Sequence, residues 1–195
     1  IYGDIYDDSM WLIDLVENLL SVTRIEEGRM QIRQSAELVD EVIKEALKHT
    51  GQSRTGRTIK VEEEDELILA KMDARLIVQV LINLIGNAVK YTPQGTDITV
   101  RVKKEKAENA ERSQVIISVC DLGNGIPDDR KERVFDMFYT GSDQVADSRR
   151  SLGLGLGLCR SIINAHGGKI WISDNIPHGA VVTFTLPAEE VALNE

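Results

Sequence analysis

The segment 74–91 carries the strongest helical signal in this chain of 195 residues. Its apolar side chains recur at three- and four-residue steps, Asp73 precedes it as a candidate N-cap, and Pro93 closes it. Apolar and polar residues then alternate at 98–102 and again at 115–119, which is typical of paired strands. A helix and strands that each bury one face favour helices packed on a sheet. The sequence therefore predicts an α+β fold, arranged as a two-layer sandwich.

The remaining pattern supplies further elements for both layers. Helices are expected at 36–49, 128–136 and 156–165, and strands at 59–61, 67–72, 170–173 and 180–186. The segment 140–152 is polar, weakly patterned and followed by glycines, so we expect a mobile loop there.

Residues 5–27 are expected to form one long helix ahead of this pattern. Apolar residues recur along it from Ile5 to Ile25, and Gly28 ends it. Such a stripe needs a partner surface, which is either the rest of this chain or a helix of another subunit. We therefore divide the chain into a helical extension, 1–28, and a globular domain, 29–195.

Charge and composition exclude several classes of function. The 23 basic and 32 acidic residues give a net charge of −9, which argues against a broad nucleic-acid-binding surface. Cys120 and Cys159 lie in apolar runs and are predicted to be buried thiols. No apolar run approaches the ~18 residues of a membrane span. Since numbering begins at Ile1, we expect a piece of a longer protein, and a membrane anchor upstream stays open.

Three segments carry residues that suit the binding of an anionic ligand. In the first, 83–93, the side chains of Asn83, Asn87 and Lys90 share one helix face because they are spaced i, i+4 and i+7. Carboxamide oxygens suit Mg²⁺, and a lysine suits phosphate. An exposed polar stripe would explain the same residues equally well.

The second segment, 121–127, places Asp121 where a strand opens into a glycine turn. Its carboxylate could accept a hydrogen bond from an amino group in a pocket, and glycines let the backbone approach a flat ring. An ordinary turn with a capping Asp is the alternative. The third segment, 153–158, has three glycines at the start of a helix, where N–H groups attract phosphate. Arg149 and Arg150 precede it as phosphate contacts or as solvated charges.

Taken together and in this order, these segments resemble the catalytic, ATP-binding domain of sensor histidine kinases, within the gyrase, Hsp90, histidine kinase and MutL superfamily. The matching motifs are the N box at 83–93, the first Gly box at 121–127, the F box at 135–138 and the second Gly box at 153–158. The resemblance covers essentially the whole chain, and among subfamilies it is greatest to potassium-responsive, KdpD-type sensor kinases. It implies a Bergerat-type ATP-binding fold, with 1–28 as the second helix of a dimerisation hairpin.

The resemblance also implies a role for each matching residue. Asn87 would coordinate Mg²⁺, Asn83 would support the metal or phosphate shell, and Asp121 would accept from the adenine amino group. The other implied ATP-binding residues are Lys90, Tyr91, Gly123, Gly125, Ile126, Arg149, Arg150, Gly153, Gly155, Gly157, Leu158 and Thr183. The implied cofactors are ATP and Mg²⁺. The implied partners are a response regulator receiver domain and a second subunit, with the domain in the cytoplasm and its parent anchored in the membrane.

The sequence departs from the family pattern in two respects. None of His49, His166 and His178 stands in a phosphoacceptor context, so the γ-phosphoryl group of ATP would pass to a histidine outside this chain and then to a response regulator. Thr140 occupies a position where the family usually has a basic residue.

Three alternative functions remain open at this stage. The first is ATP hydrolysis, but hydrolysing members place a general-base Glu where this chain has Asn83, and an amide is not a useful base. The second is a nucleotide-sensing interaction module without catalysis. The third is a helical signalling adaptor that binds no nucleotide.

Overall fold

The computed structural model describes residues 2–50, 57–64, 67–106, 111–137 and 155–190. Its elements are, in chain order, α1 (Tyr2–Glu26), β1 (Ser35–Leu38), α2 (Val39–His49), β2 (Ile59–Glu63), β3 (Leu69–Met72), α4 (Ala74–Tyr91), β4 (Ile98–Lys106), β5 (Ser113–Cys120), α5 (Asp128–Lys131), the 3₁₀ turn η1 (Arg133–Phe135), α6 (Gly155–Ala165), β6 (Ile170–Asp174) and β7 (Ala180–Glu189).

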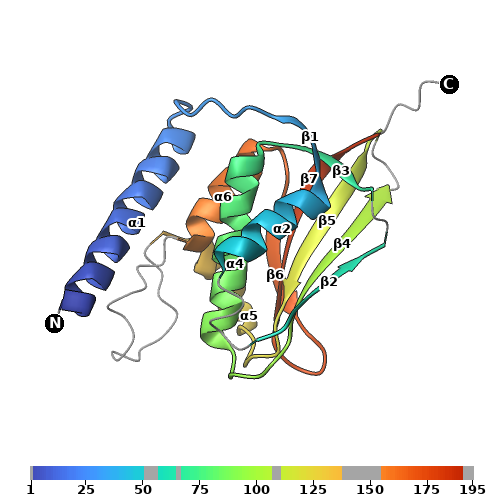
Figure 1. Cartoon of the computed structure of the whole chain (residues 1–195). Helices are drawn as coiled ribbons and strands as arrows, with labels where there is room; N and C mark the ends of the chain where they lie inside the picture. Colours follow the sequence, from blue (N-terminus) through green and yellow to red (C-terminus); the bar gives the residue numbers. More distant parts are fainter. Residues whose placement is uncertain (1, 51–56, 65–66, 107–110, 138–154, 191–195) are drawn as a thin grey trace.

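The described strands form a mixed sheet, and α2, α4 and α6 lie on one face of it (Figure 1). The strand order is β1-β3-β7-β5-β4-β2, and β6 pairs with β7 as well. Strand β2 runs parallel to β4, whereas the other pairs are antiparallel. The predicted α+β sandwich of two layers is confirmed.

The hydrophobic core lies between α4 and the centre of the sheet. Ile77, Leu81 and Leu84 of α4 are fully buried, as are Ile117 of β5 and Phe184 of β7. Each such side chain contributes about 1.5–3 kcal/mol by leaving water, so the sandwich holds α4 firmly in place. Both cysteines are free and buried, as predicted, and burial raises the pKa of the Cys159 thiol to about 12.

Several segment boundaries differ from the sequence prediction, and two of these differences share one cause. The helix expected at 36–49 begins only at Val39, because residues 35–38 form β1 and pair with β3, with Leu38 opposite Leu69. The strands expected at 98–102 and 115–119 are longer, because β4 and β5 pair as far as Lys106 and Ser113. In both places backbone pairing at the sheet outweighs the local side-chain pattern.

Asp73 stands at the N-cap position of α4, as predicted, but its side chain makes no capping hydrogen bond. Its Oδ2 accepts from the backbone N–H of Arg33 at 3.1 Å and pairs with Arg75 at 3.1 Å. Its own backbone N–H donates to Nε2 of His166 at 3.0 Å. Asp73 therefore joins the segment after α1, the start of α4 and the end of α6.

We expect His166 to make the stability of the fold depend on pH. Nδ1 of the buried ring donates to the Ile162 carbonyl at 2.7 Å, and Nε2 accepts from Asp73, so the folded state requires the neutral ring. Burial lowers the pKa of His166, against the raising effects of the Ile162 carbonyl and the Asp73 charge. The contribution to stability is therefore complete above about pH 6.5, the ordinary histidine pKa, and is lost as the pH falls below it.

Urea unfolding at pH 7.5 and pH 5.5 measures this effect. The wild-type chain should lose more free energy of unfolding between the two pH values than His166→Gln, which cannot take up a proton there. Equal losses in both chains would exclude His166 as the source.

Helix α1 confirms the long N-terminal helix, and Gly28 with φ of 66° follows its end. Val22 is buried and Ile25 packs against the core, so the end of α1 rests on the sandwich beside α6 (Figure 1). Large apolar side chains are nevertheless exposed along it, namely Tyr2, Ile5, Tyr6, Met10, Leu12, Ile13, Val16, Leu19 and Leu20. Among the described helices, none combines the length and apolarity that crossing a membrane requires.

Candidate nucleotide-binding site

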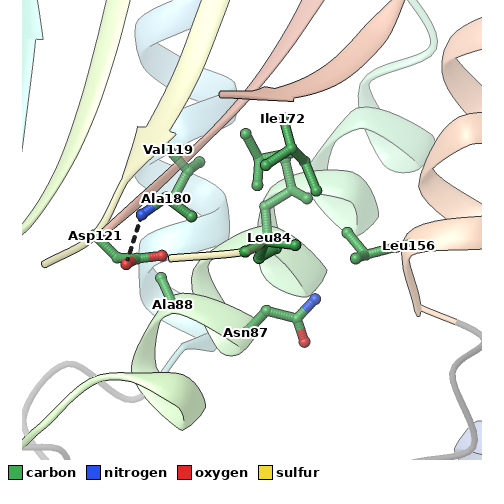
Figure 2. Close-up of a pocket in the computed structure, with 10 residues that line it drawn as sticks. Leu84, Asn87, Ala88, Val119, Asp121, Leu156, Ile172 and Ala180 are labelled. Atoms are coloured by element: carbon green, nitrogen blue, oxygen red, sulfur yellow. Dashed lines mark hydrogen bonds between the residues drawn. The ribbon is translucent and has the colours of Figure 1, made fainter. Parts of the chain in front are cut away.

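A pocket lies between α4, α6 and the sheet (Figure 2). It is lined by Leu84, Asn87, Ala88, Val119, Asp121, Ile126, Leu156, Ile172, Ala180 and Val182. Apart from Asn87 and Asp121, these side chains are apolar and suit the faces of a flat ring. The volume of about 50 Å³ is small beside the roughly 300–1,000 Å³ of a complete small-molecule site. The described residues therefore enclose room for part of a ring and not for a whole nucleotide.

Asp121 directly follows β5 and is held by the backbone. Its Oδ1 accepts from the N–H groups of Gly123 at 2.9 Å and Ala180 at 3.1 Å. No hydrogen bond joins Oδ2 to another described residue, and Figure 2 shows this second oxygen directed toward Leu84 on the pocket side. A fixed carboxylate with one oxygen to spare is an acceptor for an amino group of a ligand.

The turn after Asp121 lies very close to the end of α4. A Cβ on Gly123 would stand 2.9 Å from the Tyr91 carbonyl oxygen and 3.1 Å from Cγ2 of Thr92. Arg57 fixes the position of Thr92, because its buried guanidinium donates a hydrogen bond to the Thr92 carbonyl at 2.5 Å. Arg57 was not singled out in the sequence, because it lies 35 residues from its partner.

The polar face predicted on α4 exists, but its three residues have different surroundings. Asn87 lines the pocket. Asn83 instead faces the start of α6, where Nδ2 donates to the Gly155 carbonyl at 3.5 Å and Oδ1 accepts from Gln79 at 3.3 Å. Lys90 is exposed, with its Nζ 5.1 Å from the centre of the Tyr91 ring, which is exposed as well.

The glycines of the third segment lie at the start of α6, of which Gly155 is the first residue. A Cβ on Gly157 would stand 3.1 Å from the Phe135 carbonyl oxygen, so this glycine also lets η1 pack on α6. The Leu158 side chain is buried in the core. Arg149, Arg150, Gly153 and Thr140 lie outside the described residues, as does the loop expected at 140–152.

Thr183 does not lie with the predicted site residues. It is opposite Ser118 in the sheet, and the two hydroxyls are 2.9 Å apart. Since side chains alternate along a strand, Thr183 points to the face opposite that of its neighbour Val182, which lines the pocket. The geometry therefore corrects this assignment, and Ala180 and Val182 are the β7 residues at the pocket.

Several lining residues were missed because they are ordinary apolar side chains. Val119, Ile172 and Ala180 come from three different strands, and no local signal marks them as neighbours. Strand alternation would have placed Val119 on the side of the core, but only the strand order brings the three together.

The candidate site is thus an apolar slot between a sheet and its covering helices, and it ends in a carboxylate that backbone N–H groups hold. Residues 72–190 match the family described as "Histidine kinase-, DNA gyrase B-, and HSP90-like ATPase", and the chain belongs to this family.

Within the family, the chain is similar to histidine kinases. The sensor protein KdpD of Clostridium acetobutylicum is 41% identical over 189 residues, which are 97% of this chain and 20% of that protein. The chain thus spans about a fifth of the length of this relative. The catalytic domain of histidine kinase ThkA in a nucleotide-free form is 31% identical with a TM-score of 0.66, covering 80% of this chain and 95% of that one.

A second structure of ThkA, in complex with the response regulator protein TrrA, is 28% identical with a TM-score of 0.67. It covers 91% of this chain and 49% of that one. The resemblance to the ATP-binding portion of two-component histidine kinases, and to KdpD among them, is confirmed.

Proposed function

We propose that this chain binds Mg-ATP and transfers the γ-phosphoryl group to a histidine outside residues 1–195, from which it passes to a response regulator. The observation that carries the proposal is the arrangement of Asp121 and Asn87 in one pocket, where Oδ2 of Asp121 makes no hydrogen bond to another described residue. The likeness to histidine kinases supports the reaction, and the complex of ThkA with a response regulator supports the class of partner.

Asp121 would recognise the base of the nucleotide. Its Oδ2 accepts from the exocyclic amino group of adenine, while Oδ1 stays bonded to Gly123 and Ala180. The apolar side chains of Leu84, Val182 and their neighbours contact the ring faces and exclude water. Within a slot of low polarity this hydrogen bond orients the ring as well as holding it.

Asn87 fits the role of a magnesium ligand. In the described parts of the chain, no group of three His, Cys, Asp or Glu side chains could hold a metal ion. A single carboxamide oxygen, completed by phosphate oxygens and water, suits the hard, octahedral preference of Mg²⁺. The bound ion would supply neutralising charge to the phosphates. Asn87 would thereby place the triphosphate at the mouth of the pocket.

The phosphates would lie near the start of α6. We assign them Lys90 and the backbone N–H groups around Gly155 and Gly157, where the helix dipole favours an anion. Gly153, Arg149 and Arg150 belong to the same proposal. The bond from Asn83 to the Gly155 carbonyl joins this end of α6 to α4 and fixes their spacing.

The chemistry at Asn83 favours transfer over hydrolysis. Its amide points to Gly155 and Gln79 and offers no base that could activate water. A nucleophile that is itself basic, such as the imidazole of a separately presented histidine, needs only positioning and charge neutralisation from the chain.

We further propose that 1–28 belongs to a dimerisation hairpin and that 29–195 is the catalytic domain. The exposed apolar side chains of α1 support this division, because they need a covering partner such as a helix of a second subunit. The parent protein would be held at the membrane by segments outside this chain, with the domain in the cytoplasm.

A transfer assay with Asn87→Asp tests the proposed function. The histidine-bearing hairpin is supplied as a separate polypeptide with radiolabelled Mg-ATP. We expect the wild-type chain to label it, and Asn87→Asp to label it at least tenfold more slowly, since the new carboxylate repels the triphosphate. Adenosine binding, measured by calorimetry, should change less.

Asn164→Asp is the matched control, because it makes the same charge change at an exposed position of α6 outside the pocket. Equal losses of adenosine and Mg-ATP binding in Asn87→Asp would argue against the metal role. Nucleotide binding without labelling of a competent hairpin would favour the non-catalytic sensing module.

A further inference from the structure

The loop between β6 and β7, residues 175–179, packs directly on the turn that carries Asp121. Nδ2 of Asn175 donates to the Asp121 carbonyl oxygen at 2.7 Å. Nδ1 of His178 lies 3.0 Å from the Gly123 carbonyl oxygen and donates to it. The carbonyl groups of Asp121 and Gly123 are thus held by side chains from a loop more than fifty residues away in sequence.

The two backbones also touch without intervening side chains. Gly179 has a φ of 110°, and a Cβ there would stand 2.0 Å from the Asp121 carbonyl oxygen. A Cβ on Gly125 would stand 3.1 Å from the Gly179 carbonyl oxygen. The loop therefore fits the turn at van der Waals contact, and a small shift of one moves the other.

Asn175 closes its own loop while it holds the turn. Its backbone N–H donates to the Gly179 carbonyl at 3.0 Å, and its Oδ1 accepts from the N–H of Ile176 at 2.9 Å. Because the bond from Ile176 already restricts the Asn175 side chain, its bond to the Asp121 carbonyl costs little additional side-chain entropy.

These contacts decide where Oδ2 of Asp121 points. The turn contains two glycines, Gly123 and Gly125, and has wide backbone freedom when left alone. The Ala180 N–H, which lies at the end of the same loop, orients the carboxylate through Oδ1. If the loop relaxes, both the backbone and the carboxylate of Asp121 lose their fixed direction.

We propose that Asn175 and His178 are positioning residues for base recognition by Asp121. They hold the main chain of the turn so that Oδ2 meets the amino group of the base. This inference rests on the proposed function, because it assumes that Asp121 binds the base. The inference goes beyond the proposed function because it assigns the orientation of Asp121 to the loop 175–179. The side chains of Asn175 and His178 in this loop do not line the pocket.

A double-mutant cycle with calorimetry tests the proposal. The probe is adenylyl imidodiphosphate with magnesium, and the variants are Asn175→Ala, Asp121→Ala and Lys90→Ala with their combinations. Asn175→Ala should weaken binding about three- to tenfold in the wild-type and Lys90→Ala backgrounds. In the Asp121→Ala background it should weaken binding less than twofold, because it acts through Asp121.

His178 provides a rescue pair that tests the same idea independently. His178→Ala removes the donor, whereas Asn has an amide nitrogen where His has Nδ1, so His178→Asn should restore binding to within about twofold of wild type. Ile176→Ala is the control, since this side chain of the same loop is 89% exposed. If Asn175→Ala does not fold, the His178 pair still gives the answer.

The outcomes separate this inference from the proposed function. Losses that are equal in the Asp121→Ala and Lys90→Ala backgrounds, or a lowered melting temperature with unchanged binding, would overturn the positioning role. Failure of the wild-type chain to bind the probe would overturn the proposed function, and the inference with it.

Discussion

Asp121→Asn should weaken binding of an ATP analogue about 5- to 150-fold, which corresponds to about 1–3 kcal/mol for a hydrogen bond to a charged group. The two carboxylate oxygens of Asp121 explain this loss of affinity. Because the N–H groups of Gly123 and Ala180 require an acceptor, the amide oxygen of Asn must take the place of Oδ1. Its NH₂ group then faces the amino group of the base, so that one donor faces another.

Isothermal titration calorimetry at fixed magnesium measures this loss. Asp129→Asn is the matched control, since it makes the same charge change on an exposed residue of α5. An unchanged dissociation constant for Asp121→Asn would remove Asp121 from base recognition.

Gly179→Ala should be one of the most destabilising small substitutions in the chain. Its Cβ would stand 2.0 Å from the Asp121 carbonyl oxygen and 2.8 Å from the carbonyl carbon. These atoms are main chain and cannot rotate away, and the φ of 110° is itself strained for alanine. We expect a loss of about 4 kcal/mol or more in the free energy of unfolding, in the range of the rare, severe point mutations.

Urea unfolding followed by circular dichroism compares this variant with Gly86→Ala. Gly86 is exposed in the interior of α4 and a Cβ there meets nothing within 4 Å. Alanine should therefore stabilise the chain by about 0.5–1 kcal/mol at this position, because it favours the helix. A Gly179→Ala chain as stable as wild type would contradict the close approach of loop and turn.

Local signals predicted the framework of the fold well. The helix Ala74–Tyr91 has the predicted bounds, because its apolar period, its preceding Asp73 and its closing Pro93 are all contained in a single stretch of sequence. The strands of β4 and β5 were recognised for the same reason, although their ends were not. Pairing continues past Val102 where charged side chains point to solvent and cost nothing.

Errors arose wherever a distant partner decides the structure. Residues 36–38 continue a helical pattern, yet residues 35–38 pair with β3 and form a strand at the edge of the sheet. Asp73 has the sequence signature of a cap, but Arg33 and His166 supply partners that lie 40 and 93 residues away.

The residues of the candidate site likewise fall into those that local sequence predicts and those that depend on distant partners. Asp121 and Asn87 were found because polar residues beside glycine or on a helix face are conspicuous in a sequence. Thr183 was placed by its motif, whereas the register of β7 with β5 puts it on the opposite face. Asn175 and His178 support Asp121 through a contact between a loop and a turn, and no sequence pattern in the loop or in the turn predicts this contact.

The bond between Arg33 and Asp73 has a consequence for how α1 can move. It anchors the chain at Arg33, so only residues 27–32 separate the last turn of α1 from a fixed point on the sandwich. Fully stretched, that tether reaches about 20 Å. A helix of 25 residues is about 37 Å long, so α1 is longer than the linker that joins it to Arg33. Its near end stays close to α4 and α6, whichever way the far end turns.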